Sequence, residues 1–143
     1  MIMRRKLYLI ISDGGGNTPL RGVHIDKDNF LNFFKSPEGG AWKDDEILVF
    51  ENNNFDLDIL KINDLNARID KKPIDFYLIV YCGHGFTDQH NQIYFQVRPD
   101  EHLQLNDLLG VVAKSRCLVI ADSCRAKCHL REGGRIADLR MFS

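Results

Sequence analysis

Several features that would place this chain in a membrane or on a nucleic acid are missing from its sequence. The apolar run Leu7–Ile11, which follows a basic N-terminal stretch, is too short for a signal-peptide core and far too short to span a bilayer. Basic and acidic residues number 19 and 20, giving a net charge of −1 with no long basic stripe. Neither a nucleic acid nor a membrane surface is therefore expected as a partner. We expect a cytoplasmic protein that binds proteins or small molecules.

Signals for a nucleotide site and for disulfides are also lacking. The run Gly14-Gly15-Gly16 has neither the Gly-Lys-Ser/Thr ending of a phosphate loop nor the spacing of a dinucleotide fingerprint, and we interpret it as a loop. Four cysteines would permit two disulfides, but no export signal accompanies them. Cys82 and Cys117 lie in or beside apolar strand-like runs, so free thiols are expected.

The 143 residues and their 44% hydrophobic content suit one compact domain, residues 1–143, with no internal repeat and no low-complexity linker. Along this domain, apolar runs typical of strands alternate with apolar positions at helical spacing. The expected strands are 7–11, 47–50, 76–81 and 117–121, with a hairpin arm at 93–97. The expected helices lie in 26–34, 55–69 (apolar face Phe55, Ile59, Ile62 and Ile69) and 105–112.

Strands that are almost wholly apolar and alternate with helices predict a mostly parallel sheet covered by helices on both faces. Functional sites in such α/β sheets gather at the carboxyl ends of the strands. Three expected strand exits carry polar or reactive groups, namely Ser12-Asp13, Cys82-Gly83-His84 and Asp122-Ser123-Cys124. The sequence therefore predicts one site at this edge of the sheet.

The chemistry of that site depends on His84 and Cys124. An imidazole exchanges protons near neutral pH, and a thiolate attacks a carbonyl carbon, so the two together can perform covalent acyl transfer. Taken singly, His84 between two glycines could be a turn residue and Cys124 an inert buried thiol. Their pairing at neighbouring strand exits favours a cysteine peptidase.

The motifs around these residues resemble the caspase-like cysteine peptidases, especially the metacaspase and prokaryotic caspase-homologue branch. Tyr-Cys-Gly-His-Gly at 81–85 and Asp-Ser-Cys at 122–124 look like the histidine and cysteine motifs of that branch. The two residues are about 40 positions apart, near the roughly 50 typical of caspases. Pro-Leu-Arg-Gly-Val-His-Ile-Asp at 19–26 is similar to the stretch that follows the first strand in metacaspases. The resemblance implies a caspase-like three-layer sandwich.

Carried over residue by residue, the resemblance implies a Cys-His dyad and a thioester intermediate. His84 would be the general base and acid, and Cys124 the nucleophile. The amide N–H groups of Gly85 and Cys124 would form the oxyanion hole. The glycines on both sides of His84 would let a substrate backbone approach closely.

The resemblance also implies a substrate pocket that accepts Arg or Lys before the scissile bond. Asp26 and Asp122 match acidic pocket residues of the metacaspase branch, and two carboxylates in a cleft favour a guanidinium. Cys82 stands where the family has serine and would be a wall of this pocket rather than a second nucleophile. Alternatively, Asp26 could cap the following helix and Asp122 could be a turn residue.

Some positions depart from the family's pattern. The Gln-Ala-Cys-x-Gly signature is absent, which argues against cleavage after aspartate. The family often continues with His-Ser-Gly after the nucleophile, where this chain has Arg125-Ala126-Lys127.

Cys124 also lies near the end of the sequence, so the chain looks like the large-subunit part of such a domain. We expect residues 131–143 to be an exposed linker where a zymogen precursor is processed, and a small-subunit fragment of the same precursor to complete the fold. Activation by processing or by a partner protein, and a role in prokaryotic defence or regulated cell death, are family inferences.

Other interpretations compete with the peptidase. Cys117, Cys124, Cys128 and His129 could hold zinc in a zinc-stabilised α/β module, although structural zinc sites usually use paired knuckles. The chain could also be a non-catalytic caspase-like scaffold. Calcium dependence occurs in part of the metacaspase branch, but a solvated turn explains the acidic stretch at 44–46 better, and we expect no cofactor. His24, His90 and His102 lie in polar contexts and are expected to be solvated.

Overall fold

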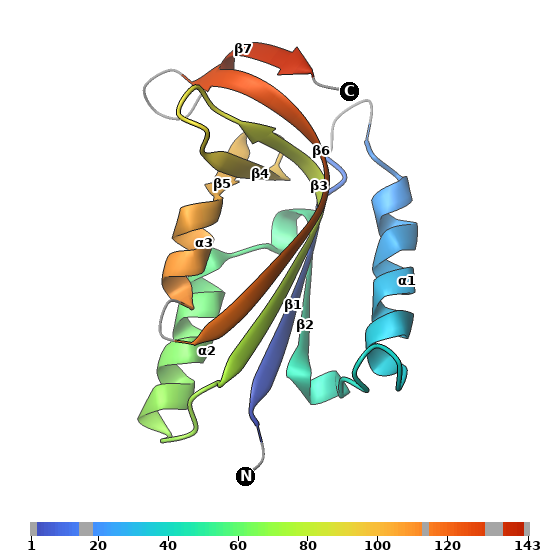
Figure 1. Cartoon of the computed structure of the whole chain (residues 1–143), viewed down its shortest axis with the longest axis vertical. Helices are drawn as coiled ribbons and strands as arrows, with labels where there is room; N and C mark the ends of the chain where they lie inside the picture. The colour runs from blue at the N-terminus through green and yellow to red at the C-terminus, as the bar shows by residue number, and fades with distance from the viewer. Residues whose placement is uncertain (1–2, 15–18, 113–114, 131–135, 142–143) are drawn as a thin grey trace.

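The structure, a computed structural model, describes residues 3–14, 19–112, 115–130 and 136–141, and only the backbone at 53, 123–130 and 136–141. Strands and helices alternate through most of the chain (Figure 1). The strands are β1 (Arg5–Ile11), β2 (Ile47–Glu51), β3 (Phe76–Thr87), β4 (Ile93–Arg98), β5 (Glu101–Gln104), β6 (Arg116–Leu130) and β7 (Ile136–Met141). The helices are α1 (Gly22–Lys35), α2 (Leu57–Ile69) and α3 (Leu105–Val111), with 3₁₀ turns at η1 (Asp44–Glu46) and η2 (Asn52–Asn54).

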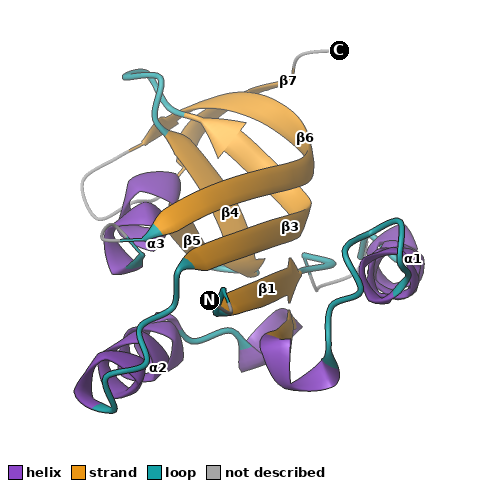
Figure 2. Cartoon of the chain, turned by 60° about the horizontal axis from the view of Figure 1, so that its bottom comes forward, coloured by secondary structure: helices purple, strands orange, loops and turns teal. Residues whose placement is uncertain are grey.

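The strands form one sheet that is mostly parallel. β2, β1, β3 and β6 lie side by side in parallel, while β4 pairs antiparallel with the end of β3, β5 with β4, and β7 with β6. β3 is the central strand, because β6 follows one of its edges along its whole length while β1 and then β4 share the other. The strands curve strongly beyond the end of β1 (Figure 2).

Helices cover both faces of this sheet, which gives the expected three layers. α1 lies on one face, and α2 and α3 lie on the other (Figure 1). The apolar run in β1 supplies both interfaces, since side chains alternate along a strand. Tyr8 and Ile10 enter the core under α2 and α3, whereas Leu7, Leu9 and Ile11 enter the core under α1.

Two strands continue well beyond their expected ends. β3 runs to Thr87 instead of Tyr81, and β6 runs to Leu130 instead of Ala121. The prediction that His84 and Cys124 follow strand ends was therefore wrong in detail. Glycine normally weakens a strand, but β4 pairs with residues 85–87 and β7 pairs with residues 126–130, so both strands keep hydrogen-bonding neighbours.

Helix α2 buries a different face from the one predicted. Ile59, Ile62 and Ile69 are 40%, 54% and 65% exposed. The helix instead buries Leu60 and Asp64 against the sheet. Its sequence carries apolar residues on two sides, and periodicity alone does not decide which side packs inward.

The expected linker at 131–143 is partly a strand. Residues 136–141 form β7, which pairs antiparallel with the end of β6 from Ala126↔Met141 to Leu130↔Ile136. A strand in this stretch has a physical basis, because the extended edge of β6 offers unpaired backbone groups. Residues 131–135 and 142–143 lie outside the described residues.

Candidate active site

The pairing of β3 with β6 brings the two proposed reacting residues together. The parallel ladder runs from Phe76↔Arg116 to Thr87↔Lys127, and within it His84 is the register partner of Cys124. Neighbouring strands are about 4.8 Å apart, so the two backbones occupy facing positions. The side chain of Cys124 lies outside the described part of the chain, whereas that of His84 is described and half-buried.

The imidazole of His84 lies against the loop that follows β1. A Cβ added to Gly14, in the loop after β1, would be 2.9 Å from Cδ2 and 3.3 Å from Nε2 of this ring. The same added atom would be 3.3 Å from Oε1 of Gln96 on β4. The loop after β1 therefore borders the histidine, and the side chain of Gln96 lies close to the same point of this loop.

The backbone of His84 is held by the buried hydroxyl of Tyr81. That O–H lies 2.6 Å from the carbonyl oxygen of His84 and 2.7 Å from the carbonyl oxygen of Gln96. Burial raises the pKa of Tyr81, and the nearby Cys82 adds to this shift. The phenol therefore stays protonated and able to donate.

Gly85, the proposed oxyanion-hole residue, lies inside the sheet. It is the register partner of Phe95 on β4 and of Arg125 on β6. The strands thus place Gly85 directly beside the His84↔Cys124 pair, while an oxyanion role for its N–H group stays a prediction.

The three residues predicted for the substrate pocket lie near one another. Burial raises the pKa of the Cys82 thiol to about 12, and the charges of Asp122 and Asp26 add to the shift. Cys82 is fully buried and is the register partner of Asp122, while Asp26 is half-buried on α1. The acidic pair therefore lies on the α1 face of the sheet, two residues before the His84↔Cys124 pair.

The alternative local roles of these residues do not fit the structure. The residue that caps the start of α1 is Arg21, and Asp26 lies inside the helix. Asp122 lies in β6 and His84 in β3, so neither is a turn residue.

A polar cluster beside the site was not predicted from the sequence. His24 Nε2 lies 2.9 Å from Asp13 Oδ2, and His24 Nδ1 lies 3.4 Å from Glu51 Oε2. Lys27 Nζ lies 2.7 Å from the other oxygen of Glu51. The expectation of a solvated His24 was wrong, because its partners are distant in the sequence and only the fold brings them to it.

His102 also departs from the expectation of a solvated side chain. It is half-buried, and its ring lies 5.0 Å from that of Phe86 in an edge-on arrangement. Burial lowers the pKa of His102, which favours the neutral ring.

The backbone does not favour the zinc interpretation. Cys124, Cys128 and His129 lie on one extended strand, which places the Cα atoms of the two cysteines about 13 Å apart. Structural zinc sites instead draw their ligands together on tight turns. Among the side chains that the structure describes, no group of three His, Cys, Asp or Glu residues could hold a metal ion.

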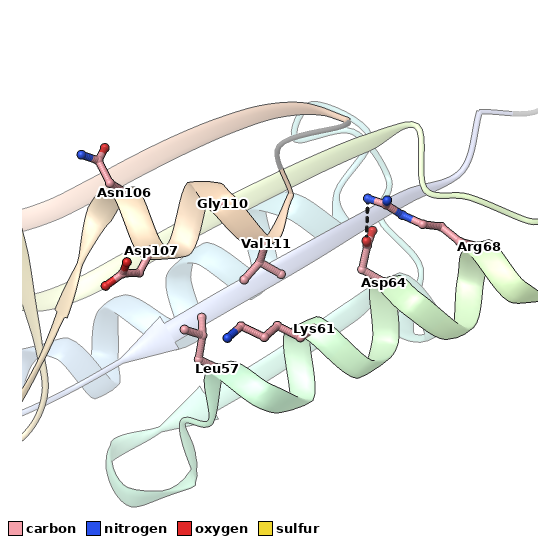
Figure 3. Close-up of a pocket in the computed structure, with 8 residues that line it drawn as sticks. All are labelled: Leu57, Lys61, Asp64, Arg68, Asn106, Asp107, Gly110 and Val111. Atoms are coloured by element: carbon pink, nitrogen blue, oxygen red, sulfur yellow. Dashed lines mark ion pairs between the residues drawn. The ribbon is translucent and has the colours of Figure 1, made fainter.

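A groove of about 720 Å³ lies between α2 and α3, away from the site (Figure 3). Its lining includes Lys61, Asp107 and the ion pair of Asp64 Oδ2 with Arg68 Nη2 at 2.8 Å. The residues described around the groove include no cysteine, serine or threonine. It belongs to the opposite face of the sheet from α1 and is not part of the candidate active site.

Within the described ranges, no helix is both long enough and apolar enough to cross a membrane.

The chain matches no protein-family model and no curated protein. It is similar to the crystal structure of caspase-1 from Spodoptera frugiperda, with a TM-score of 0.57 and 14% sequence identity. The match covers 94% of this chain and 61% of that chain. The mostly parallel sheet, its flanking helices and this likeness together show that the chain has a caspase-like fold.

Proposed function

We propose that this chain carries the catalytic dyad of a caspase-like cysteine endopeptidase, of the metacaspase or prokaryotic caspase-homologue type. The main support is the parallel register that sets His84 opposite Cys124 at the edge of a caspase-like sheet. The Asp-Ser-Cys and Gly-His-Gly motifs supply the same two residues. A role in prokaryotic defence or regulated cell death belongs to this proposal.

The reaction follows from the two side chains. His84 takes the thiol proton of Cys124, and the sulfur attacks the peptide carbonyl carbon to give a tetrahedral oxyanion beside the N–H groups of Gly85 and Cys124. His84 then gives the proton to the leaving amine as the C–N bond breaks, and a thioester remains. A water molecule then attacks the carbonyl carbon of the thioester, and His84 takes a proton from this water. The acid leaves, and the thiol regains its proton.

The substrate is proposed to be a polypeptide with Arg or Lys before the scissile bond. Asp26 and Asp122 place two carboxylates near the wall formed by Cys82, and a guanidinium can bind carboxylates in a bidentate manner. The high pKa of Cys82 keeps its sulfur protonated, which suits a wall residue rather than a nucleophile.

We also propose that a small-subunit fragment of the same precursor, or an activating protein, completes the domain. Leu118 and Ile120 on β6 are 52% and 37% exposed. They alternate with residues that pack under α3, so they belong to the face that α1 covers only in part. Intact-mass measurement of the purified protein would show whether a second fragment accompanies the chain. A chain that is active without any companion would contradict this part of the proposal.

Fluorogenic peptides ending in Arg, Lys or Asp test the peptidase, and the assay uses the chain together with the companion fragment or activating protein. We expect cleavage after Arg and Lys, and a loss of about 10³-fold or more in Cys124→Ala and His84→Ala. Cys117→Ala is the matched control, because Cys117 is a half-buried cysteine on the same strand. Activity that survives Cys124→Ala contradicts the mechanism. A folded protein that cleaves none of these peptides favours the scaffold alternative.

The acidic pocket is tested by Asp26→Asn and Asp122→Asn. Each should raise KM for an arginyl peptide by roughly 10-fold, since one charge-assisted contact is lost. Asp28→Asn is the control, because Asp28 lies on the same helix with a side chain that is 72% exposed. Equal KM values in all three variants would show that Asp26 and Asp122 do not bind the basic side chain of the substrate.

A further inference from the structure

The loop after β1 comes unusually close to the ring of His84. A methyl group at Gly14 would approach Cδ2 to 2.9 Å, which is closer than real Cβ atoms lie to such carbons. Gly14 also has φ of +84°, in the region that favours glycine. The backbone of Gly14 therefore occupies the space beside the imidazole, and Gln96 Oε1 would lie 3.3 Å from the same added atom.

The residue before Gly14 is held at its backbone and at its carboxylate. The N–H of Asp13 donates to Asn52 Oδ1 at 3.0 Å, and its carbonyl oxygen accepts from the N–H of Leu20 at 2.7 Å. Asp13 Oδ2 accepts from Asn52 Nδ2 at 3.2 Å and lies 2.9 Å from His24 Nε2. These four contacts, which we call the Asp13 clamp, fix where the chain enters Gly14.

Two further residues tie the Asp13 clamp to the rest of the fold. Glu51, at the end of β2, lies 3.4 Å from His24 Nδ1 and accepts from Lys27 Nζ at 2.7 Å. His24 and Lys27 both belong to α1. The clamp therefore joins β2, α1 and the loop after β1.

The chain just before His84 is equally confined. The N–H of Ser12 donates to the carbonyl oxygen of Cys82 at 2.9 Å. A Cβ at Gly83 would be 2.5 Å from the Ser12 carbonyl oxygen and 2.6 Å from the Tyr81 hydroxyl oxygen. The backbone that carries the histidine is thus fixed by the same end of β1 from which the loop with Gly14 departs.

Building on the proposed function, we propose that Asp13 and Gly14 are positioning residues that set the orientation of the His84 imidazole before substrate binds. The clamp holds Gly14 in place, and Gly14 limits how far the ring can turn. Catalytic rates depend strongly on such placement, because a displacement of about 1 Å costs on the order of 10²-fold. The orientation of a catalytic side chain is preserved when the residues that contact it are themselves held rigidly by their neighbours.

Gly14→Ala and Asp13→Asn test the proposal with two readouts. The first is peptide hydrolysis, where we expect kcat to fall about 10- to 100-fold while KM changes by less than about threefold. The second is the ¹H–¹³C NMR signal of the His84 ring, assigned with His84→Gln, which should move in both variants. Gly110→Ala is the control, because an added Cβ there meets nothing within 4 Å.

The two readouts separate this proposal from the proposed function. Wild-type kcat together with an unmoved His84 signal in both variants would overturn the positioning role. If the wild-type protein cleaves no peptide even with its companion bound, the peptidase proposal fails and the ring signal alone decides the positioning role. If Gly14→Ala does not fold, Asp13→Asn decides it by the same measurements, since it keeps the size of the side chain.

Discussion

The two faces of the sheet differ in what covers them. The face under α2 and α3 holds most of the buried aromatic rings, including Tyr8, Tyr77, Tyr81 and Phe95. The face under α1 is largely aliphatic, and its cover stops before β6, where Leu118 is 52% exposed. The candidate active site lies on this second face.

This difference separates a closed core on one face of the sheet from the proposed site on the other. On the aromatic face the described tyrosine hydroxyls are satisfied, since no buried side-chain polar atom in the described part of the chain lacks a partner. On the α1 face, Asp26 and Asp122 lie near Cys82, and Asp26 is half-buried while Asp122 is exposed. A substrate can reach a site only where the covering layer is incomplete.

The largest expected effect is on stability and tests the aromatic face. Ile79 is fully buried there, so Ile79→Ala should lower the free energy of unfolding by about 2–5 kcal/mol. Leu118→Ala on the open face should cost less than about 1 kcal/mol. Urea denaturation of both variants measures the difference. Equal losses of unfolding free energy in the two variants would mean that the α1 face is also covered in solution, and the two faces would then not differ.

A smaller effect is expected from the buried polar pair under α2. The O–H of Tyr77 donates to Asp64 Oδ1 at 2.5 Å, and burial together with Asp64 raises the pKa of Tyr77, so the phenol remains a donor. Tyr77→Phe leaves the buried carboxylate with one partner fewer and should cost about 1–3 kcal/mol. A double-mutant cycle with Asp64→Asn measures the coupling. A coupling energy near zero would show that the hydrogen bond between Tyr77 and Asp64 does not stabilise the fold.

The smallest effect concerns Cys82, the fully buried residue that is proposed as a wall of the pocket. Burial and two carboxylates raise its pKa from 9.0 to about 12, so the folded state holds the proton more tightly than the unfolded state. The resulting contribution to stability is fully present below about pH 9 and is lost as the pH rises through about 12. Iodoacetamide at pH 8 should therefore leave Cys82 unmodified in the folded protein and label it after unfolding. Peptide mapping by mass spectrometry checks this. Rapid labelling of Cys82 would show that its thiol is accessible to solvent in the folded protein.

The order of strands and helices could be predicted from the sequence, because it depends on local periodicity. β1, β2 and β4 begin or end within two residues of expectation, and all three helices are present where expected. β5 and β7 were missed, since short or polar strands form only when a neighbouring edge is available.

Predictions that depended on contacts between distant residues were less successful. The inward side of α2 follows from the shape of the sheet beneath it, so Ile59 and Ile62 were wrongly assigned to the core. The cluster of Asp13, His24 and Glu51 carries no local signal in the sequence, because its members approach only after β1, α1 and β2 have packed. The neighbourhood of Cys82, Asp26 and Asp122 was anticipated because a family resemblance, rather than periodicity, placed those residues together.

The unbroken ladder between β3 and β6 makes the length of β6 as important as its composition. One residue inserted between Arg116 and Cys124 would shift the register by one position and set Ser123 across from His84. Every later side chain of that strand would also turn to the opposite side of the sheet. A hydroxyl would then stand where a thiol is proposed to react, so relatives of this chain that share its chemistry should conserve the residue count of this segment even where its amino acids vary.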